Sequence, residues 1–197
     1  MIGTKPYKED YQYNKFGFTG MVTQKEGQML EDYAFVICKT RVKPALVEIG
    51  SYGGSSTAYI ANGIKRSRNF RFQFNAVDTF MASNPELDGR DTLDLFKENL
   101  RRCNLIHYVI PIRATSLEAV KFFKEEELDF IFIDGSHELE DVINDIKGWL
   151  EKLSVGSLMA VHDTLMFDGV RYGLLQFEDQ LELIAAVDSL KIFRKIN

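Results

Sequence analysis

The stretch Ala45-Leu-Val-Glu-Ile-Gly-Ser-Tyr-Gly-Gly-Ser-Ser56 decides the fold, because it combines three features in a fixed order. An apolar run interrupted only by Glu48 predicts a buried strand, since strands covered on both faces are almost continuously hydrophobic. The glycines then predict a tight turn, and Ser55 suits the start of a helix. Strand, glycine turn and helix together form the unit from which parallel sheets with ligand-binding turns are built.

On both sides of this stretch, apolar runs typical of strands alternate with stretches of helical apolar spacing. The predicted strands are 45–50, 72–78, 108–112, 128–134 and 157–161, and the predicted helices are 24–39, 55 onward, 92–103, 118–126, 139–153 and 170–177. Two last apolar runs, Leu181–Val187 and Leu190–Ile196, predict a hairpin that turns at Asp188-Ser189. The alternation predicts an α/β fold, a doubly wound, mostly parallel, seven-stranded Rossmann-like sheet with an antiparallel last strand.

Composition and charge exclude several classes of protein. Of the 197 residues, 45% are hydrophobic and 27% charged, which is typical of a soluble globular domain. The formal net charge of −5 argues against nucleic acid as a default partner. No apolar run approaches the roughly 18 residues of a membrane helix, and Met1–Asp10 lacks the apolar centre of a signal peptide. Two cysteines, Cys38 and Cys103, are too few for a disulfide scaffold, so we expect a reduced, cytoplasmic setting.

The chain is predicted to consist of an irregular lead-in, residues 1–20, and one domain, residues 21–197. The lead-in and the loop 84–91 are the segments left to cover a pocket. The basic cluster Lys65–Arg71 is interpreted as a solvated helix end, with a ligand-binding patch as the alternative. The oligomeric state stays open between a monomer and a homo-oligomer.

The glycine turn does not match the motifs that bind phosphates. A dinucleotide site requires G-x-G-x-x-G, in which the second glycine lets the backbone approach a pyrophosphate. Here Tyr52 stands two residues after Gly50, where its side chain obstructs a pyrophosphate. No lysine follows Gly53 or Gly54, so the Walker pattern is missing as well. Glu48 has the wrong charge for a phosphate and suits an ammonium group.

Asp78 indicates which ligand the turn would bind. It ends the second predicted strand, where an acidic side chain is placed to accept hydrogen bonds from both hydroxyls of a ribose. A nucleoside without phosphates that carries a charged amino acid agrees with Asp78, with Glu48 and with the glycine turn. S-adenosylmethionine is such a molecule, and we expect it as the cofactor.

Four motifs in order give the chain a family resemblance. They are Glu48-Ile-Gly-Ser-Tyr-Gly-Gly-Ser-Ser56, Val77-Asp78-Thr79, Ile133-Asp134-Gly-Ser-His137 and Val161-His162-Asp163-Thr164. Over roughly residues 20–197 the chain resembles the class I S-adenosylmethionine-dependent methyltransferases. Within them it is most similar to the small metal-dependent group that includes macrolide-sugar O-methyltransferases of the macrocin and mycinamicin type. The resemblance implies that residues 21–197 are an S-adenosylmethionine-binding methyltransferase domain.

The resemblance also implies a role for each matching residue around the cofactor. Asp78, with the adjacent Thr79, would bind the ribose hydroxyls, and Glu48 would lie near the ammonium group. The remaining cofactor-binding residues implied are Gly50, Ser51, Tyr52 and Ser56 at the methionine part, Thr115 and Ser116 at the adenine, and Asp134.

A divalent cation, Mg²⁺ or Mn²⁺, is implied at Asp134, His162 and Asp163. The metal-dependent relatives have carboxylates at these places, so His162 is a departure. Two carboxylates with one imidazole favour Mn²⁺ over Mg²⁺. The alternative is that His162 supports the site or faces the substrate without a metal.

His137 matches the general base of the sugar-methylating relatives. A hydroxyl is a weak nucleophile, so its proton must leave as the new bond forms, and histidine suits this work near neutral pH. Asp134 is the second predicted catalytic residue, because a carboxylate at the end of an apolar strand is costly without a partner. We therefore expect an O-methyltransferase whose partner is a small molecule, such as a sugar unit.

Two other functions stay open from the sequence. An NAD-dependent oxidoreductase would use a related sheet, although Tyr52 opposes it. A non-catalytic nucleic-acid-binding module of the same fold is supported only by the cluster Lys65–Arg71.

Overall fold

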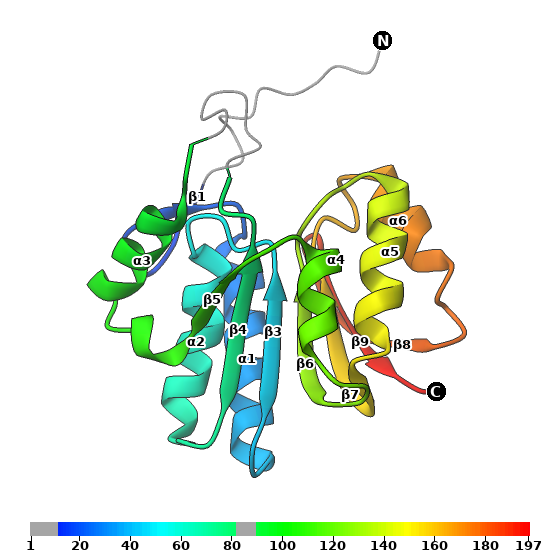
Figure 1. Ribbon diagram of the computed structural model, residues 1–197, viewed down its shortest axis with the longest axis horizontal. Helices are drawn as coiled ribbons and strands as arrows, with labels where there is room; N and C mark the ends of the chain where they lie inside the picture. Colours follow the sequence, from blue (N-terminus) through cyan, green and yellow to red (C-terminus); the bar gives the residue numbers. More distant parts are fainter. Residues whose placement is uncertain (1–11, 82–89) are drawn as a thin grey trace.

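The computed structural model describes residues 12–81 and 90–197, and its main feature is a seven-stranded sheet with helices on both faces (Figure 1). The strands of this sheet are β3 (Ala45–Ile49), β4 (Gln73–Asp78), β5 (Ile110–Arg113), β6 (Leu128–Ile133), β7 (Leu153–Val161), β8 (Leu181–Val187) and β9 (Leu190–Lys195). The α-helices are α1 (Gln24–Thr40), α2 (Ser55–Ser67), α3 (Leu93–Arg102), α4 (Ser116–Ala119), α5 (Leu139–Leu150) and α6 (Asp168–Leu175). None of the described helices has the length and apolar character needed to cross a membrane.

The strand order β5-β4-β3-β6-β7-β9-β8 places β3 near the centre of the sheet. β3 pairs in parallel with β4 on one side and with β6 on the other. β9 runs antiparallel to both of its neighbours, β7 and β8. The predicted doubly wound sheet with an antiparallel last strand is thus confirmed. Because the strand order reverses between β3 and β6, the ends of these strands are where such sheets bind ligands.

Alternation along β3 divides the core into two layers. Leu46 packs in the layer that contains α1, α2 and α3, whereas Val47 and Ile49 pack in the layer that contains α5 and α6. Because successive side chains of a strand point to opposite faces, Glu48 is directed toward the side of α1 and α2. This places a carboxylate beneath the start of α2.

Part of the predicted lead-in is regular and lies against the sheet domain. The strands β1 (Gln12–Tyr13) and β2 (Thr19–Gly20) form an antiparallel pair. The side chain of Asn14 donates a hydrogen bond of 3.0 Å to Oγ of Ser55, the first residue of α2. This contact joins the lead-in to the glycine turn, while residues 1–11 lie outside the described residues.

The helix predicted at 118–126 begins earlier and is shorter. α4 spans Ser116–Ala119 and continues as a 3-10 turn over Val120–Phe122. A capping box fixes the earlier start, since the Thr115 side chain accepts from a backbone amide of the first turn. Phe123 has extended backbone angles, which end the turn.

The helix predicted at 139–153 also ends earlier, and the strand after it starts earlier. Gly156 lies inside β7, with a φ of 81° and beside a shift in register against β6. The carbonyl oxygens of Leu150 and Leu153 accept hydrogen bonds from Nζ of Lys195, at 3.0 and 2.9 Å. This buried lysine satisfies the carboxyl end of α5, which the sequence pattern did not indicate.

Candidate active site

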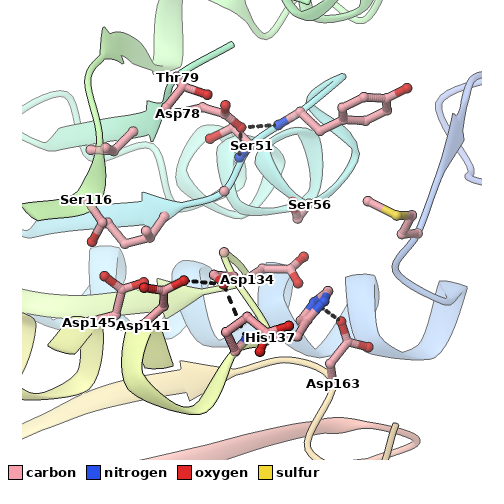
Figure 2. Close-up of a pocket in the computed structure, with 18 of the residues that line it drawn as sticks. Ser51, Ser56, Asp78, Thr79, Ser116, Asp134, His137, Asp141, Asp145 and Asp163 are labelled. Atoms are coloured by element: carbon pink, nitrogen blue, oxygen red, sulfur yellow. Dashed lines mark hydrogen bonds and ion pairs between the residues drawn. The ribbon is translucent and has the colours of Figure 1, made fainter. Parts of the chain in front are cut away.

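A pocket of about 1220 Å³ lies over the carboxyl ends of β3, β4 and β6. The glycine turn, the loops after β6 and β7, and the first turns of α4, α5 and α6 also contribute to its wall. In Figure 2, Ser51 and Asp78 lie on one side of the opening, and Asp134, His137 and Asp163 lie on the other. The location agrees with the ligand-binding edge of doubly wound sheets, and the volume accommodates a cofactor together with an acceptor.

Gly50 starts the glycine turn at a position where a side chain does not fit. Its φ is 82°, in the left-handed region that favours glycine. A Cβ atom at this position would lie 2.0 Å from the carbonyl oxygen of Asp134. The absence of a side chain therefore lets the ends of β3 and β6 approach each other at the floor of the pocket.

Asp78 fixes the next two residues of the turn. Its Oδ2 accepts hydrogen bonds from the backbone amides of Ser51 and Tyr52, at 2.8 and 2.7 Å (Figure 2). Its Oδ1 accepts a third, of 2.7 Å, from the amide of Phe80. An ionised carboxylate has about four acceptor positions, so Asp78 can still accept a hydrogen bond from a ligand hydroxyl.

Glu48 lies beneath the turn, with its side chain fully buried. Its Oε2 accepts hydrogen bonds from Oγ of Ser51, at 3.1 Å, and from Oγ1 of Thr57. The hydroxyl group of Ser56 also interacts with this carboxylate and lowers its pKa, while Oε1 has no partner in hydrogen-bond geometry among the described residues. Burial, together with the nearby charge of Asp134, raises the pKa of Glu48 to about 7. A cationic group near Oε1 would supply the missing partner and favour the ionised carboxylate.

The residues predicted for the adenine, Thr115 and Ser116, lie at another part of the same wall. Thr79, predicted beside Asp78 at the ribose, lines the pocket as well. Oγ of Ser116 accepts a hydrogen bond of 2.8 Å from Nε1 of Trp149, so its orientation is fixed by a buried ring. The hydroxyl group of Thr115 is engaged in the capping box of α4.

Three carboxylates surround His162, whose side chain is only 5% exposed. Nδ1 of His162 lies 3.1 Å from Oδ1 of Asp134 and 3.4 Å from Oδ1 of Asp163. The other ring nitrogen, Nε2, lies 3.1 Å from Oε2 of Glu26 on α1. Burial by itself lowers the pKa of His162, but the charge of Asp134 and the hydrogen bonds to the carboxylates outweigh it and raise the pKa.

His137 lies at the pocket wall between an acidic side chain and an aromatic ring. Its Nε2 is 2.9 Å from Oδ2 of Asp163, and its ring stacks on Phe167 with centroids 3.9 Å apart and planes 4° apart. Burial would raise the pKa of Asp163, but hydrogen bonds from His137 and His162 lower it below the usual range. Asp163 is therefore an ionised acceptor, and these contacts fix the position of the imidazole.

The residues predicted for a metal bring together donor atoms that could hold a divalent cation. Asp134, His162 and Asp163 each offer one donor atom, and these atoms lie within 4.8 Å of one another. Adjacent donors at about 2.1 Å from a six-coordinate ion are separated by about 3.0 Å. The observed separations of 3.1 and 3.4 Å are close to this value. Two carboxylates and an imidazole suit Mn²⁺ or a similar ion better than Mg²⁺.

The structure gathers the predicted site residues around one pocket. Those in the wall are Gly50, Ser51, Tyr52, Ser56, Asp78, Thr79, Thr115, Ser116, Asp134, His137 and Asp163. Glu48 and His162 are buried among these residues and contact them. Of the predicted covering loop 84–91, residues 84–89 lie outside the described part of the chain.

Three further residues of the site do not follow from the sequence analysis. Asp145 on α5 is 7% exposed and lines the pocket, and burial raises its pKa. Its signal is the spacing from Asp141, since residues four apart share one face of a helix. Phe167 and Glu26 have no comparable signal, because their partners His137 and His162 lie far away in sequence.

Comparisons with known proteins agree with this geometry. A family model described as a methyltransferase domain matches residues 47–164, which is more than half of the chain. The O-methyltransferase NovP is 16% identical, with a TM-score of 0.75 over 90% of this chain and 82% of that one. An O-methyltransferase from Bacillus cereus in complex with SAH is 18% identical, with a TM-score of 0.63 over 88% and 82%. The O-methyltransferase TomG from Streptomyces achromogenes, in complex with SAM, is 14% identical, with a TM-score of 0.64 over 89% and 82%. At these identities the likeness to the solved structures concerns the fold.

Proposed function

The chain belongs to the methyltransferase-domain family, and from this premise we propose that it transfers the methyl group of S-adenosylmethionine to a hydroxyl group of a small molecule. One observation carries the proposal: a single pocket holds the glycine turn bound by Asp78 and, opposite to it, the imidazole of His137 (Figure 2). The first element suits the nucleoside of the cofactor, and the second suits removal of a proton from the acceptor.

The cofactor would lie along the turn. Asp78 would accept a hydrogen bond from a ribose hydroxyl at its remaining acceptor position, with Thr79 beside it, and Thr115 and Ser116 would border the adenine. The methionine part would then reach the turn itself, above Glu48. The unpartnered Oε1 of Glu48 supports this placement, because a buried carboxylate without a partner is costly and an ammonium group would satisfy it.

The transfer needs a base for the acceptor hydroxyl. If Nε2–H of His137 donates to Oδ2 of Asp163, Nδ1 carries the lone pair and can accept the hydroxyl proton. The hydroxyl oxygen forms a bond to the methyl carbon while the carbon–sulfur bond breaks. The electron pair of that bond stays on sulfur, so the positively charged sulfonium becomes the neutral thioether of S-adenosylhomocysteine.

Asp134, His162 and Asp163 would hold a divalent cation of the Mn²⁺ type at the same wall. Such a cation, when bound, supplies Lewis-acid stabilisation of the ionised acceptor oxygen. Asp134 and Asp163 face the pocket, so their carboxylates orient the groups that bind there. Oδ2 of Asp163 meanwhile keeps the ring of His137 in place.

The charge of the pocket supports an acceptor without negative groups. None of the described residues that line it is a lysine or an arginine. Seven described residues of the wall are acidic, namely Asp78, Asp134, Glu138, Asp141, Asp145, Asp163 and Asp168. A phosphate, a carboxylate or a nucleic acid would be repelled by these groups. The exposed rings of Phe167 and Tyr172 offer an apolar face next to the carboxylates, which suits a sugar-like molecule.

No observation favours the two alternatives from the sequence. The basic cluster Lys65–Arg71 lies at the opposite end of α2 from the pocket, about 20 Å along the helix. Within it, Arg66 pairs with Glu31 and Asp32, so part of its charge is neutralised inside the chain. We further propose a reducing, cytoplasmic setting, because neither Cys38 nor Cys103 forms a disulfide.

The proposal is tested by calorimetric titration of the full chain with S-adenosylmethionine and, separately, with NADH. We expect binding of the first only. Asp78→Ala is expected to abolish it, because the turn loses its anchor and the ribose its acceptor. Asp179→Ala, an exposed acidic residue of the α6–β8 connection, is the matched control. Transfer of labelled methyl to neutral sugars and catechols then tests the acceptor class. Binding of NADH in place of S-adenosylmethionine would contradict the proposal.

A further inference from the structure

Glu26 is an unusual partner for a residue of the pocket, because it comes from the first turn of α1. It is 1% exposed and belongs to the capping box of that helix, in which its Oε2 accepts a hydrogen bond of 2.8 Å from the amide of Thr23. Its Oε1 accepts another of 2.8 Å from the amide of Ser189, in the turn between β8 and β9. The remaining contact of Oε2, at 3.1 Å, is with Nε2 of His162.

These contacts keep a proton on Nε2 of His162. Two backbone amides donate to Glu26, one to each of its carboxylate oxygens. A carboxylate that already accepts from two amides acts as an acceptor, so Nε2 of His162 donates to Oε2. Nδ1, on the opposite edge of the ring, is directed at the carboxylates of Asp134 and Asp163. A cation bound at Nδ1 would take the place of the proton that Nδ1 otherwise donates to these two carboxylates, while Nε2 keeps its hydrogen bond to Glu26.

Glu26 and the pocket lie on opposite edges of the ring. Asp134 and Asp163 line the pocket, whereas Glu26 and His162 are buried behind them. Histidine ligands of metals commonly donate their second N–H to a carboxylate, which fixes the tautomer and strengthens the ligand. The same arrangement is present here: Glu26 contacts one nitrogen of the His162 ring, and Asp134 and Asp163 contact the other.

We propose that Glu26 is a positioning residue that makes His162 a metal ligand through Nδ1, so that an imidazole replaces a carboxylate in this site. The inference rests on the proposed function only for the presence of the cation. The role proposed for Glu26 is separate from the roles of the glycine turn, the cofactor-binding residues and His137. It also explains why the side chain of Glu26 is directed at the site although its helix contributes none of the predicted ligands.

Glu26→Gln tests this role, because the amide keeps the shape of the side chain and removes its charge. We expect calorimetric titration of the full chain with Mn²⁺ to show about 10- to 100-fold weaker binding, the usual cost of losing such a partner. Thr23→Ala is the matched control, since it removes the hydroxyl group of the same capping box and leaves the contact between Glu26 and His162. It is expected to lower the melting temperature without changing the affinity for Mn²⁺.

A second background separates positioning from a merely structural role. In His162→Asp the ligand is itself a carboxylate, and Glu26 becomes a buried like charge beside it. Adding Glu26→Gln to this variant is expected to tighten Mn²⁺ binding or leave it unchanged, the reverse of its effect beside His162. Equal weakening in both backgrounds would overturn the proposal, because loss of a structural contact acts regardless of the ligand.

The failure of this inference is distinguishable from failure of the proposed function. Wild-type chain that binds S-adenosylmethionine and transfers methyl groups, but does not bind Mn²⁺, would overturn the role of Glu26 alone. Wild-type chain that binds Mn²⁺, with the expected reversal between the two backgrounds, would support it even if no methyl acceptor is found. The titrations measure metal affinity directly, so neither result depends on the activity of the loaded enzyme.

Discussion

The imidazole of His137 makes two contacts that fix it in different ways. Asp163 is bound to one of its nitrogens, and Phe167 covers one face of its ring. A ring held in this way is oriented before the acceptor arrives, which is what proton transfer within hydrogen-bond distance requires. Neither contact involves the residues assigned to the cofactor, so binding and transfer should separate experimentally.

His137→Ala should therefore reduce kcat by about 10²- to 10⁴-fold, the range for loss of a general base. The dissociation constant for S-adenosylmethionine should stay unchanged in a calorimetric titration. His107→Ala, which changes an exposed histidine outside the pocket wall, provides the control and should keep both values. Full turnover of His137→Ala on the true acceptor would show that another group takes the proton.

Glu48 should make the stability of the protein depend on pH. Its pKa is raised from 4.5 to about 7 in the folded state by burial, so folding favours the protonated carboxyl. The stabilising contribution of Glu48 to the folded state is fully present below pH 4.5 and is lost as the pH rises through 7. A shift of this size corresponds to about 3 kcal/mol over that window.

Glu48→Gln keeps the neutral form at every pH and should remove this dependence. Urea denaturation across this pH range should show the free energy of unfolding of the variant rising, relative to wild type, by about 3 kcal/mol. Glu182→Gln, at an exposed position on β8, is the control and should run parallel to wild type. If the unfolding free energies of Glu48→Gln and wild type change in parallel with pH, the carboxyl group of Glu48 ionises normally in the folded protein.

At the scale of the elements, the glycine turn depends on the approach of two strands. Gly50 combines a left-handed φ with the carbonyl group of Asp134 in the space of a Cβ. Gly156 in β7 has nearly the same φ, but a Cβ there would meet nothing within 4 Å. Substitutions at these two glycines therefore distinguish the stability cost of backbone strain from the cost of steric exclusion.

Gly156→Ala should cost about 1 kcal/mol of stability, the price of a left-handed conformation in a residue with a side chain. Gly50→Ala should cost more than about 3 kcal/mol, because the backbone of Asp134 must also move. Urea denaturation measures both values, and S-adenosylmethionine affinity should fall for Gly50→Ala alone. Similar losses of stability in the two variants would show that the end of β6 moves at little cost to accommodate a side chain at position 50.

The boundaries of the elements were harder to predict than their existence. Gly156 has the residue type that often ends a helix, yet its position in a bulged strand depends on pairing with β6. The end of α5 depends on Lys195, which comes from the far end of the chain. Such contacts between distant residues leave no periodic pattern in the sequence.

At the scale of the whole molecule, the main strands and their mostly parallel direction could be predicted, because the buried strands are nearly continuous in apolar residues and alternate with helices. The pocket could be located for the same reason, since polar residues at the ends of parallel strands meet at one edge. Asp78 and Asp134 are examples in which the strand end alone indicated the position. Glu26 is the opposite case, because its place beside His162 depends on how α1 packs, which local patterning does not specify.

The contact between Glu26 and the β8–β9 turn has a consequence for the order in which the protein matures. Synthesis proceeds from the N-terminus, so α1 and the whole pocket wall are made before Ser189. Until that turn arrives, Glu26 lacks one of the amides that fix its carboxylate, and Thr164 beside the site lacks the backbone group it binds on Ser189. A nascent chain could thus form the nucleoside side of the pocket early, whereas the side that holds His162 is completed only by the closing hairpin.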